Sequence, residues 1–207
     1  MPIVQSRAVS MAGFVVIEGI DGCGKSSVSR ALAERFGKRA VLTREPTKSW
    51  IGRAVHAGDK QKISPYTDAL LFMADRAQHT EEIARLVKKG KLVVCDRYYH
   101  STIAYQAACL DKVCPGDAFK WLLEANLRIS RRPDLTVLLV IPPELGLSRV
   151  KGRKSLSRFE KLGFLKKVSK NYLKLAKIDR SIVKVDGTKD LDSVVDRVFE
   201  LVQERKL

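Results

Sequence analysis

The residues from position 19 to position 26 combine three glycines with a lysine and a serine, in a spacing that suits phosphate binding. They match the pattern G-x-x-x-x-G-K-[ST] in full. Glycines let backbone N–H groups turn toward phosphate oxygens, Lys25 can reach the outer phosphates, and Ser26 can bind Mg²⁺. Because an apolar run precedes this segment and an amphipathic pattern follows it, we predict a nucleotide-phosphate loop. The predicted loop residues are Gly19, Ile20, Asp21, Gly22, Cys23, Gly24, Lys25, Ser26 and Ser27.

A carboxylate at the end of another apolar run fits the same chemistry. Asp96 directly follows the run Leu-Val-Val-Cys, which has the composition of a buried strand. In phosphate sites of this kind, an acid at the end of a strand holds Mg²⁺, usually through water. We therefore predict a metal site made by Ser26 and Asp96.

The loop indicates a bound nucleotide but does not define the reaction. Further segments are TREPT at 43–47, LLFMADRAQ at 70–78, VVCDRYYHSTIAYQ at 93–106, SRFE at 157–160 and VDGT at 185–188. Together with the loop, they resemble the thymidylate kinase family, particularly its archaeal and bacterial forms, from about residue 13 onward. The resemblance implies ATP-dependent phosphorylation of dTMP to dTDP, with ATP and Mg²⁺ as cofactors, by a homodimeric enzyme.

The chemistry of such a transfer explains the residue types involved. A nucleoside monophosphate is already an anionic nucleophile, so it needs no general base. The enzyme must instead hold two polyanions in line and neutralise the charge on the transferred phosphoryl group. Arginine, lysine and Mg²⁺ suit that task. With the resemblance, this gives the predicted catalytic residues Lys25, Arg97, Asp21, Arg153 and Arg149.

The resemblance implies that Phe72 stacks on the thymine ring and that Arg76 donates to a carbonyl of the base. The two residues lie four positions apart on an expected helix, so both side chains can face one pocket. A planar base suits an aromatic face and a forked donor. From the neighbouring apolar residues alone, Phe72 would instead be assigned to the core.

Two arginines follow expected strands and match family positions. Arg97 would hold the acceptor phosphate, and Arg44 is placed similarly after the second strand. The alternative for Arg44 is a surface ion pair with Glu45, which would contribute little. Asp21, inside the loop, corresponds to the family acid near the sugar 3′-hydroxyl and the acceptor site.

Three further residues of the acceptor pocket come from the 93–106 block. Tyr105 matches an aromatic residue that packs where a ribose 2′-hydroxyl would lie, which would favour deoxyribose. Thr102 and Gln106 are expected to line the same pocket.

The arginine that stabilises the transition state lies either in the phosphate loop or in a mobile lid in this family. Here the loop position after Asp21 is Gly22, so the resemblance places the arginine in the lid, at about 146–160. Arg153 is the first choice and Arg149 the second. The basic residues of the lid are Arg149, Lys151, Arg153, Lys154 and Arg158.

The chain departs from the family pattern at two places. Many relatives have TREPGGT, whereas TREPT is followed here by Lys48-Ser49-Trp50. The fourth strand often ends in an acid, whereas this chain has Val140 there. If that acid orders the lid or the metal-bound waters, reduced activity is expected.

Hydrophobic periodicity predicts the elements that must position these residues. Apolar runs of buried-strand type occur at about 14–17, 40–43, 92–95, 135–141 and 182–185. Helical patterns occur at about 26–36, 64–89, 101–108, 117–128 and 191–201, with one or two helices in the basic stretch.

This alternation predicts an α/β fold with a five-stranded parallel sheet and helices on both faces. The resemblance implies the arrangement of a P-loop nucleoside monophosphate kinase with a basic lid segment. We expect a flexible tail at 1–12 and a single domain at 13–207. Ligands of such sheets bind beyond the carboxyl ends of the strands.

The net charge of +16 arises from 39 Lys and Arg against 23 Asp and Glu. Between positions 149 and 184, 13 basic residues face only two acids. Most of these lysines fit a solvated helix face, so nucleic acid is not the expected partner. The alternatives are a kinase with another acceptor such as dUMP, or a weakly active P-loop protein that binds nucleic acid through 149–184.

Targeting and redox signals point to the cytoplasm. No apolar run approaches the length of a membrane helix, and no secretory signal pattern is present. Four cysteines at irregular spacing are too few for a disulfide scaffold. We therefore expect a cytoplasmic enzyme without a membrane partner.

Overall fold

A parallel sheet forms the centre of the molecule. The computed structural model describes residues 12–111, 113–150 and 161–207. Its strands are β1 (Gly13–Gly19), β2 (Ala40–Arg44), β3 (Leu92–Asp96), β4 (Leu135–Val140) and β5 (Ile182–Asp186). They form one five-stranded sheet in the order β2-β3-β1-β4-β5, with parallel neighbours throughout. The predicted sheet is confirmed; the predicted tail lies, apart from its last residue, outside the described part.

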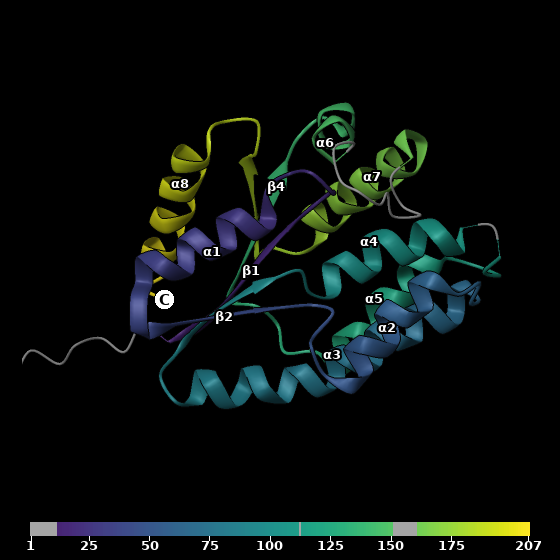
Figure 1. Cartoon of the computed structure of the whole chain (residues 1–207), viewed down its shortest axis with the longest axis horizontal. Helices are drawn as coiled ribbons and strands as arrows, with labels where there is room; N and C mark the ends of the chain where they lie inside the picture. Colours follow the sequence, from purple (N-terminus) through teal and green to yellow (C-terminus); the bar gives the residue numbers. More distant parts are fainter. Residues whose placement is uncertain (1–11, 112, 151–160) are drawn as a thin grey trace, which may run out of the picture.

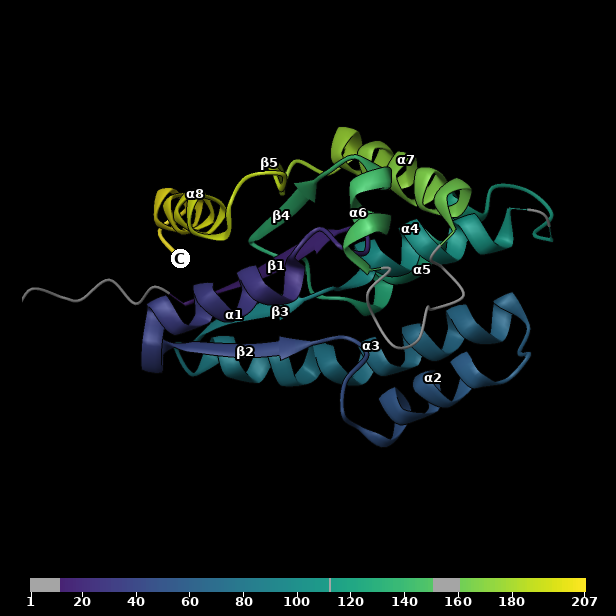
Figure 2. The same cartoon turned by 45° about the horizontal axis from the view of Figure 1, so that its top comes forward.

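Helices cover both faces of the sheet (Figures 1 and 2). On one face, α1 (Lys25–Phe36) packs against α8 (Leu191–Glu204). The other face carries α3 (Pro65–Lys88), α4 (Tyr99–Leu110), α5 (Ala118–Ile129) and α7 (Leu162–Ile178). Because both faces are covered, β1 and β3 are buried along their whole length, which explains their nearly continuous apolar sequences.

The helix α2 (Trp50–Lys60) has no counterpart among the predicted helices. It contains Gly52 and Gly58, and glycine is a poor helix former. The Ser49 hydroxyl starts this helix by accepting a hydrogen bond from the Gly52 N–H at 3.0 Å. A Cβ on Gly52 would lie 2.0 Å from the Thr47 carbonyl oxygen, so the glycine permits a close approach to the preceding loop.

The basic stretch at 149–184 contains α7 and the last two residues of α6 (Pro143–Val150), consistent with the one or two helices predicted there. The residues between these helices, 151–160, lie outside the described residues. A short 3-10 turn, η1 (Gly37–Arg39), completes the connection from α1 to β2. None of the helices in the described part of the chain is long and apolar enough to cross a membrane.

The sheet register brings the ends of three strands together. Ile17 of β1 lies beside Asp96 of β3, and Asp96 lies beside Arg44 of β2. The segments that follow these strands therefore meet at one edge of the sheet. That edge carries most of the predicted functional residues.

Candidate active site

The phosphate loop connects β1 to the N-terminus of α1. Gly22 and Gly24 have φ angles of 81° and 96°, which residues other than glycine rarely adopt. Lys25 is only 5% exposed, and its Nζ donates hydrogen bonds to the carbonyl oxygens of Gly19 and Ile20, each at 2.9 Å. The loop thus places a lysine and the N-terminus of a twelve-residue helix at one point, where they favour an anion.

Ser26 and Asp96 come together beside the loop. The Ser26 hydroxyl donates to Asp96 Oδ2 at 2.6 Å. Asp96 Oδ1 is buried and has no hydrogen-bond partner among the described residues. A hydroxyl and a carboxylate with one unused buried oxygen form the kind of hard oxygen donor set that suits Mg²⁺.

Asp21, Arg97 and Tyr105 form a cluster next to the loop. Arg97 is ion-paired with the Asp21 carboxylate, and the Tyr105 hydroxyl donates to Asp21 Oδ2 at 2.9 Å. Burial raises the pKa of Asp21, but the charges of Arg97 and Lys25 outweigh that effect and lower it to about 2. Arg97 has a φ of 73°, and its N–H donates to the Ile17 carbonyl at 3.1 Å. The backbone at the end of β3 therefore directs this arginine toward the loop.

Glu18 is a functional candidate that sequence reasoning missed. Its buried carboxylate accepts hydrogen bonds from the N–H groups of Tyr98 at 2.7 Å and Ser101 at 3.2 Å, at the start of α4. It also accepts from the hydroxyls of Ser101 at 2.7 Å and Tyr172 at 2.8 Å. Arg97 donates to the same Ser101 hydroxyl at 3.3 Å. The available signal was an acid inside an otherwise apolar strand.

Arg76 is held in a buried polar network. Its Nε donates to Glu45 Oε2 at 2.9 Å, and its other nitrogens donate to Asn126 at 2.8 Å and to Thr102 at 2.9 Å. Arg76 is 1% exposed and Glu45 is 2% exposed. A buried ion pair with this many partners fixes the guanidinium rigidly. Thr102 therefore accepts a hydrogen bond from Arg76, in addition to its predicted role in lining the acceptor pocket.

The structure places Arg44 at the exposed end of β2. The alternative of a surface ion pair between Arg44 and Glu45 is wrong, because Glu45 is buried. Its carboxylate is occupied by Arg76 and by His79 Nδ1, which lies 3.0 Å from Oε1. Arg44 keeps an exposed position near the strand ends.

Phe72 is half-buried on α3. Among the described residues, the partly buried apolar side chains that pack against the main core include Met73 but not Phe72. This placement favours the pocket role over core packing. Gln106, predicted to line the same pocket, is buried and donates to Asp68 Oδ2 at 3.2 Å.

Asp75 is a second residue that the sequence did not single out. Its carboxylate accepts from the N–H of Thr47 at 2.7 Å, from the Thr47 hydroxyl at 2.5 Å and from the Ser49 hydroxyl at 3.0 Å. These contacts fix the loop that departs from the TREPGGT pattern. Asp75 and Arg76, adjacent on α3, thus secure both this loop and Glu45.

Only one of the two candidate lid arginines lies in the described part of the chain. Arg149 Nη1 lies 3.4 Å from the Gly22 carbonyl oxygen and 3.3 Å from that of Gly187. A Cβ on Gly22 would lie 2.2 Å from the carbonyl oxygen of Gly146 in α6, so that loop position has no room for a side chain. The predicted residues Lys151, Arg153, Lys154 and Arg158 lie outside the described residues.

The end of β4 carries Val140 in place of the expected acid, but an acidic residue lies beside it on β5. Val140 lies beside Asp186 in the register of β4 and β5, and its carbonyl accepts from the Gly187 N–H at 2.9 Å. Asp186 Oδ1 accepts from the N–H and hydroxyl of Thr188 at 2.9 and 2.6 Å, which lowers its pKa. The Asp186 carboxylate therefore stabilises the turn that follows β5.

The phosphate loop and the Arg97–Asp21 ion pair lie side by side at the carboxyl ends of β1 and β3. The parallel sheet with its phosphate loop, together with the sequence matches, places the chain among phosphotransferases of the nucleoside monophosphate kinase class. Residues 17–198 match the sequence model described as thymidylate kinase. The chain belongs to the thymidylate kinase family, and its reaction is the predicted ATP-dependent phosphorylation of dTMP to dTDP.

The sequences of related proteins align with this chain over most of its length. A probable thymidylate kinase of Thermococcus onnurineus (strain NA1) is 39% identical, over 94% of this chain and 98% of its own. One from Pyrococcus abyssi is also 39% identical, over 94% and 97% of the two chains. The solved structure of a thymidylate kinase from Candida albicans has a TM-score of 0.79 at 24% identity and covers 95% of this chain and 94% of that one. That likeness supports the fold.

Proposed function

We propose that the phosphoryl transfer takes place at the carboxyl ends of β1 and β3, with ATP on the phosphate loop and the dTMP phosphate at Arg97. The single observation that carries this placement is the ion pair between Arg97 and Asp21, which brings the end of β3 to the loop. Arg97 would bind the acceptor phosphate and keep it in line with the donor. Asp21 and the Tyr105 hydroxyl would orient Arg97 and border the sugar.

On the donor side, the loop N–H groups and Lys25 would hold the phosphates of ATP. The proposed Mg²⁺ would be held by Ser26 and Asp96, supported by the unused buried Oδ1 of Asp96. When bound, the ion neutralises charge on the outer phosphates. Arg149, already in contact with the loop carbonyl of Gly22, would add positive charge on the same side.

On the acceptor side, Phe72 would stack on the thymine ring. A guanidinium has five N–H donors, and four are used by Glu45, Asn126 and Thr102. The remaining donor of Arg76 can reach a base carbonyl without loss of the network. Tyr105, buried and hydrogen-bonded, would fill the space of a ribose 2′-hydroxyl. A ribonucleotide would then be excluded by its 2′-hydroxyl, and the acceptor would be a deoxynucleotide.

We also propose a cytoplasmic homodimer. Cys23, Cys95 and Cys114 are free thiols, which fits a reducing compartment. Trp50 of α2 and Leu70 of α3 are 73% and 53% exposed, and Ala74 is exposed one turn beyond Leu70. Exposed apolar side chains on neighbouring helices are typical of an interface.

A coupled ADP-release assay with Mg²⁺ and ATP tests this placement against dTMP, dUMP, UMP, CMP and AMP. We expect fast turnover with dTMP and little with the ribonucleotides. Arg97→Ala should abolish turnover while ATP binding survives, because Arg97 serves only the acceptor. The matched control is Arg85→Ala, an exposed arginine whose Nε contacts the Glu81 carbonyl. Equal loss of ATP binding in Arg97→Ala would mean that the acceptor site is misassigned.

A further inference from the structure

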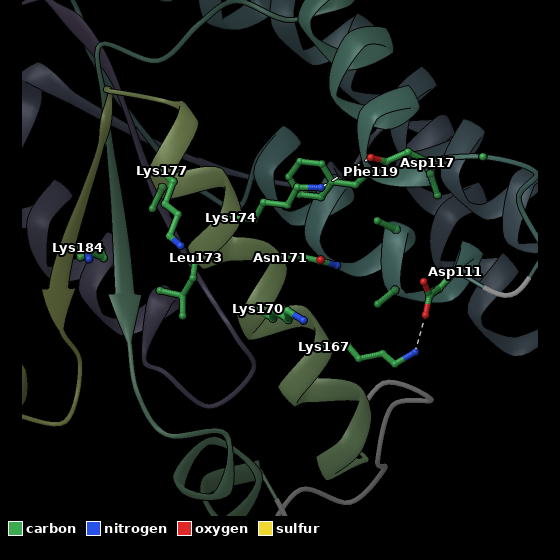
Figure 3. Close-up of a pocket in the computed structure, with 15 residues that line it drawn as sticks. Asp111, Asp117, Phe119, Lys167, Lys170, Asn171, Leu173, Lys174, Lys177 and Lys184 are labelled. Carbon is green, nitrogen blue, oxygen red and sulfur yellow. Dashed lines mark hydrogen bonds and ion pairs between the residues drawn. The ribbon is translucent and has the colours of Figure 1, made fainter.

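A cavity in the described part of the chain is lined by residues outside the proposed active site, and Figure 3 shows its lining side chains. It has a volume of about 870 Å³ and lies between α7 on one side and the end of α4 and start of α5 on the other. None of its lining residues belongs to the phosphate loop or to the Arg97 cluster. We call this cavity the α7 groove.

Lysines dominate one wall of the α7 groove. Lys167, Lys170, Lys174 and Lys177 form one stripe along α7, and Lys184 of β5 continues it. With a rise of 1.5 Å per residue, the stripe on α7 spans about 15 Å. The lysines therefore form a row of positive charges rather than a point.

Two acids on the opposite wall neutralise only part of this charge. Lys167 is ion-paired with Asp111 at 2.6 Å, and Lys174 lies 3.8 Å from Asp117. These pairs join the two walls (Figure 3). Lys170, Lys177 and Lys184 are exposed, and none of them forms an ion pair with a described acid. Three positive charges therefore face the groove without compensation.

The floor of the groove is small and apolar. It includes Ala107, Ala108, Ala118 and Ala176, and these short side chains leave the volume open. The aromatic residue that lines it, Phe119, is 7% exposed and lies under the Lys174 ammonium at 3.9 Å. No aromatic face is therefore offered for base stacking, which sequence-tolerant binders of single strands use. The groove must therefore recognise a ligand by the negative charge of that ligand.

We propose that the α7 groove binds a linear chain of phosphates, contacted by Lys170, Lys177 and Lys184. The two sources of this chemistry are the backbone of a single-stranded nucleic acid and an inorganic polyphosphate. A volume in the range of small-molecule sites accommodates several phosphates. The site is separate from the kinase reaction, so binding and turnover can be lost independently.

The test is fluorescence anisotropy with a labelled twelve-residue oligothymidylate that has a free 5′-hydroxyl, between 50 and 200 mM salt. The triple variant Lys170→Ala, Lys177→Ala, Lys184→Ala should bind at least tenfold more weakly. Its salt slope should fall by about 2, since each phosphate contact on a single strand contributes about 0.7. The matched control replaces Lys38, Lys88 and Lys89, exposed lysines before β2 and β3, with the same change in charge.

A second variant moves binding in the opposite direction and guards against misfolding. Asp111→Asn with Asp117→Asn removes both groove acids, frees Lys167 and Lys174, and should tighten binding several-fold. Asparagine can replace Asp117 as the N-cap of α5. Kinase turnover should be unchanged in all three variants, which shows that they are folded.

Competition identifies the source of the phosphates. Displacement by inorganic polyphosphate at concentrations similar to those of unlabelled oligonucleotide supports the phosphate-chain chemistry, and the tighter competitor is assigned as the ligand. Equal weakening in the groove variant and the matched control would mean diffuse attraction to a basic protein and would overturn the proposal. Absence of binding at 50 mM salt would overturn it as well.

Discussion

Arg97 owes its position to residues that do not touch a nucleotide. The Glu18 carboxylate accepts hydrogen bonds from the N–H groups of Tyr98, the N-cap of α4, and of Ser101, and from the hydroxyls of Ser101 and Tyr172. Ser101 in turn accepts from Arg97. We infer that Tyr172 and Glu18 are positioning residues for the acceptor arginine. Because Tyr172 lies on α7, this network ties that helix to the acceptor site.

Tyr172→Phe should lower kcat/KM for dTMP about fivefold and leave the KM for ATP unchanged. Burial and Glu18 raise the pKa of the Tyr172 hydroxyl well above its usual range, so it donates at any working pH. Losing one such hydrogen bond costs about 1 kcal/mol. Steady-state kinetics with each substrate varied in turn measure the effect.

The control is Tyr99→Phe, which removes a hydroxyl hydrogen bond of 3.1 Å to Asp179 and none to Glu18, Ser101 or Arg97. This variant should lose thermal stability but keep its kcat/KM for dTMP. The positioning role is contradicted if both variants change the kinetics equally.

At the residue scale, motif spacing predicted the groups that contact phosphates. Lys25, Ser26 and Asp96 follow a pattern that ties residue type to chemistry, and the structure brings them together. Glu18 and Asp75 could not be predicted from spacing. Their hydrogen-bond partners lie 26 to 154 positions away in the chain. Only the fold shows which backbone N–H groups donate hydrogen bonds to these two carboxylates.

At the element scale, burial decided which segments could be predicted. The central strands β1, β3 and β4 were predictable because coverage on both faces requires apolar residues at nearly every position. The helix α2 was not, because its two glycines lower helix propensity and its start depends on the Ser49 side chain. The contact between α6 and the phosphate loop could not be predicted from the sequence, because it is made by backbone atoms of Gly22 and Gly146.

Gly146→Ala tests the contact between α6 and the loop. The new Cβ would lie 2.6 Å from the Asp21 carbonyl oxygen, so α6 must move away from the loop. Arg149 would then lose its contacts with Gly22 and Gly187. We expect the KM for ATP to rise several-fold, with a smaller change for dTMP.

Gly163→Ala is the matched control, because nothing lies within 4 Å of a Cβ at that helical position. This variant should keep both KM values and gain a little stability, about 0.5 kcal/mol. Unchanged ATP kinetics in Gly146→Ala would show that α6 does not support the donor site.

At the scale of the whole molecule, two different surfaces flank the proposed active site. The α7 side carries the uncompensated lysines, while α2 and α3 expose Trp50 and Leu70. The sequence predicted the charge excess and its location between 149 and 184. It could not show which lysines line a groove, because the opposite wall comes from α4 and α5, far from α7 in the sequence.

Leu70→Glu should convert the proposed dimer into a monomer in sedimentation velocity. A charge at the centre of an apolar interface cannot be solvated, so association weakens strongly. The control is Leu191→Glu at the start of α8, since Leu191 is 44% exposed and Leu70 is 53% exposed. A dimer that persists in Leu70→Glu but dissociates in Leu191→Glu would place the interface on α8.

The contact between Gly22 and Gly146 also limits how this enzyme can change over evolutionary time. A side chain on Gly22 would meet the Gly146 backbone, so no replacement at position 146 makes room for it. A lineage that moved its transition-state arginine into the phosphate loop would have to displace α6 first. During that step the donor site would lack the support of Arg149. In this chain, the change from one arrangement to the other would therefore need more than one substitution.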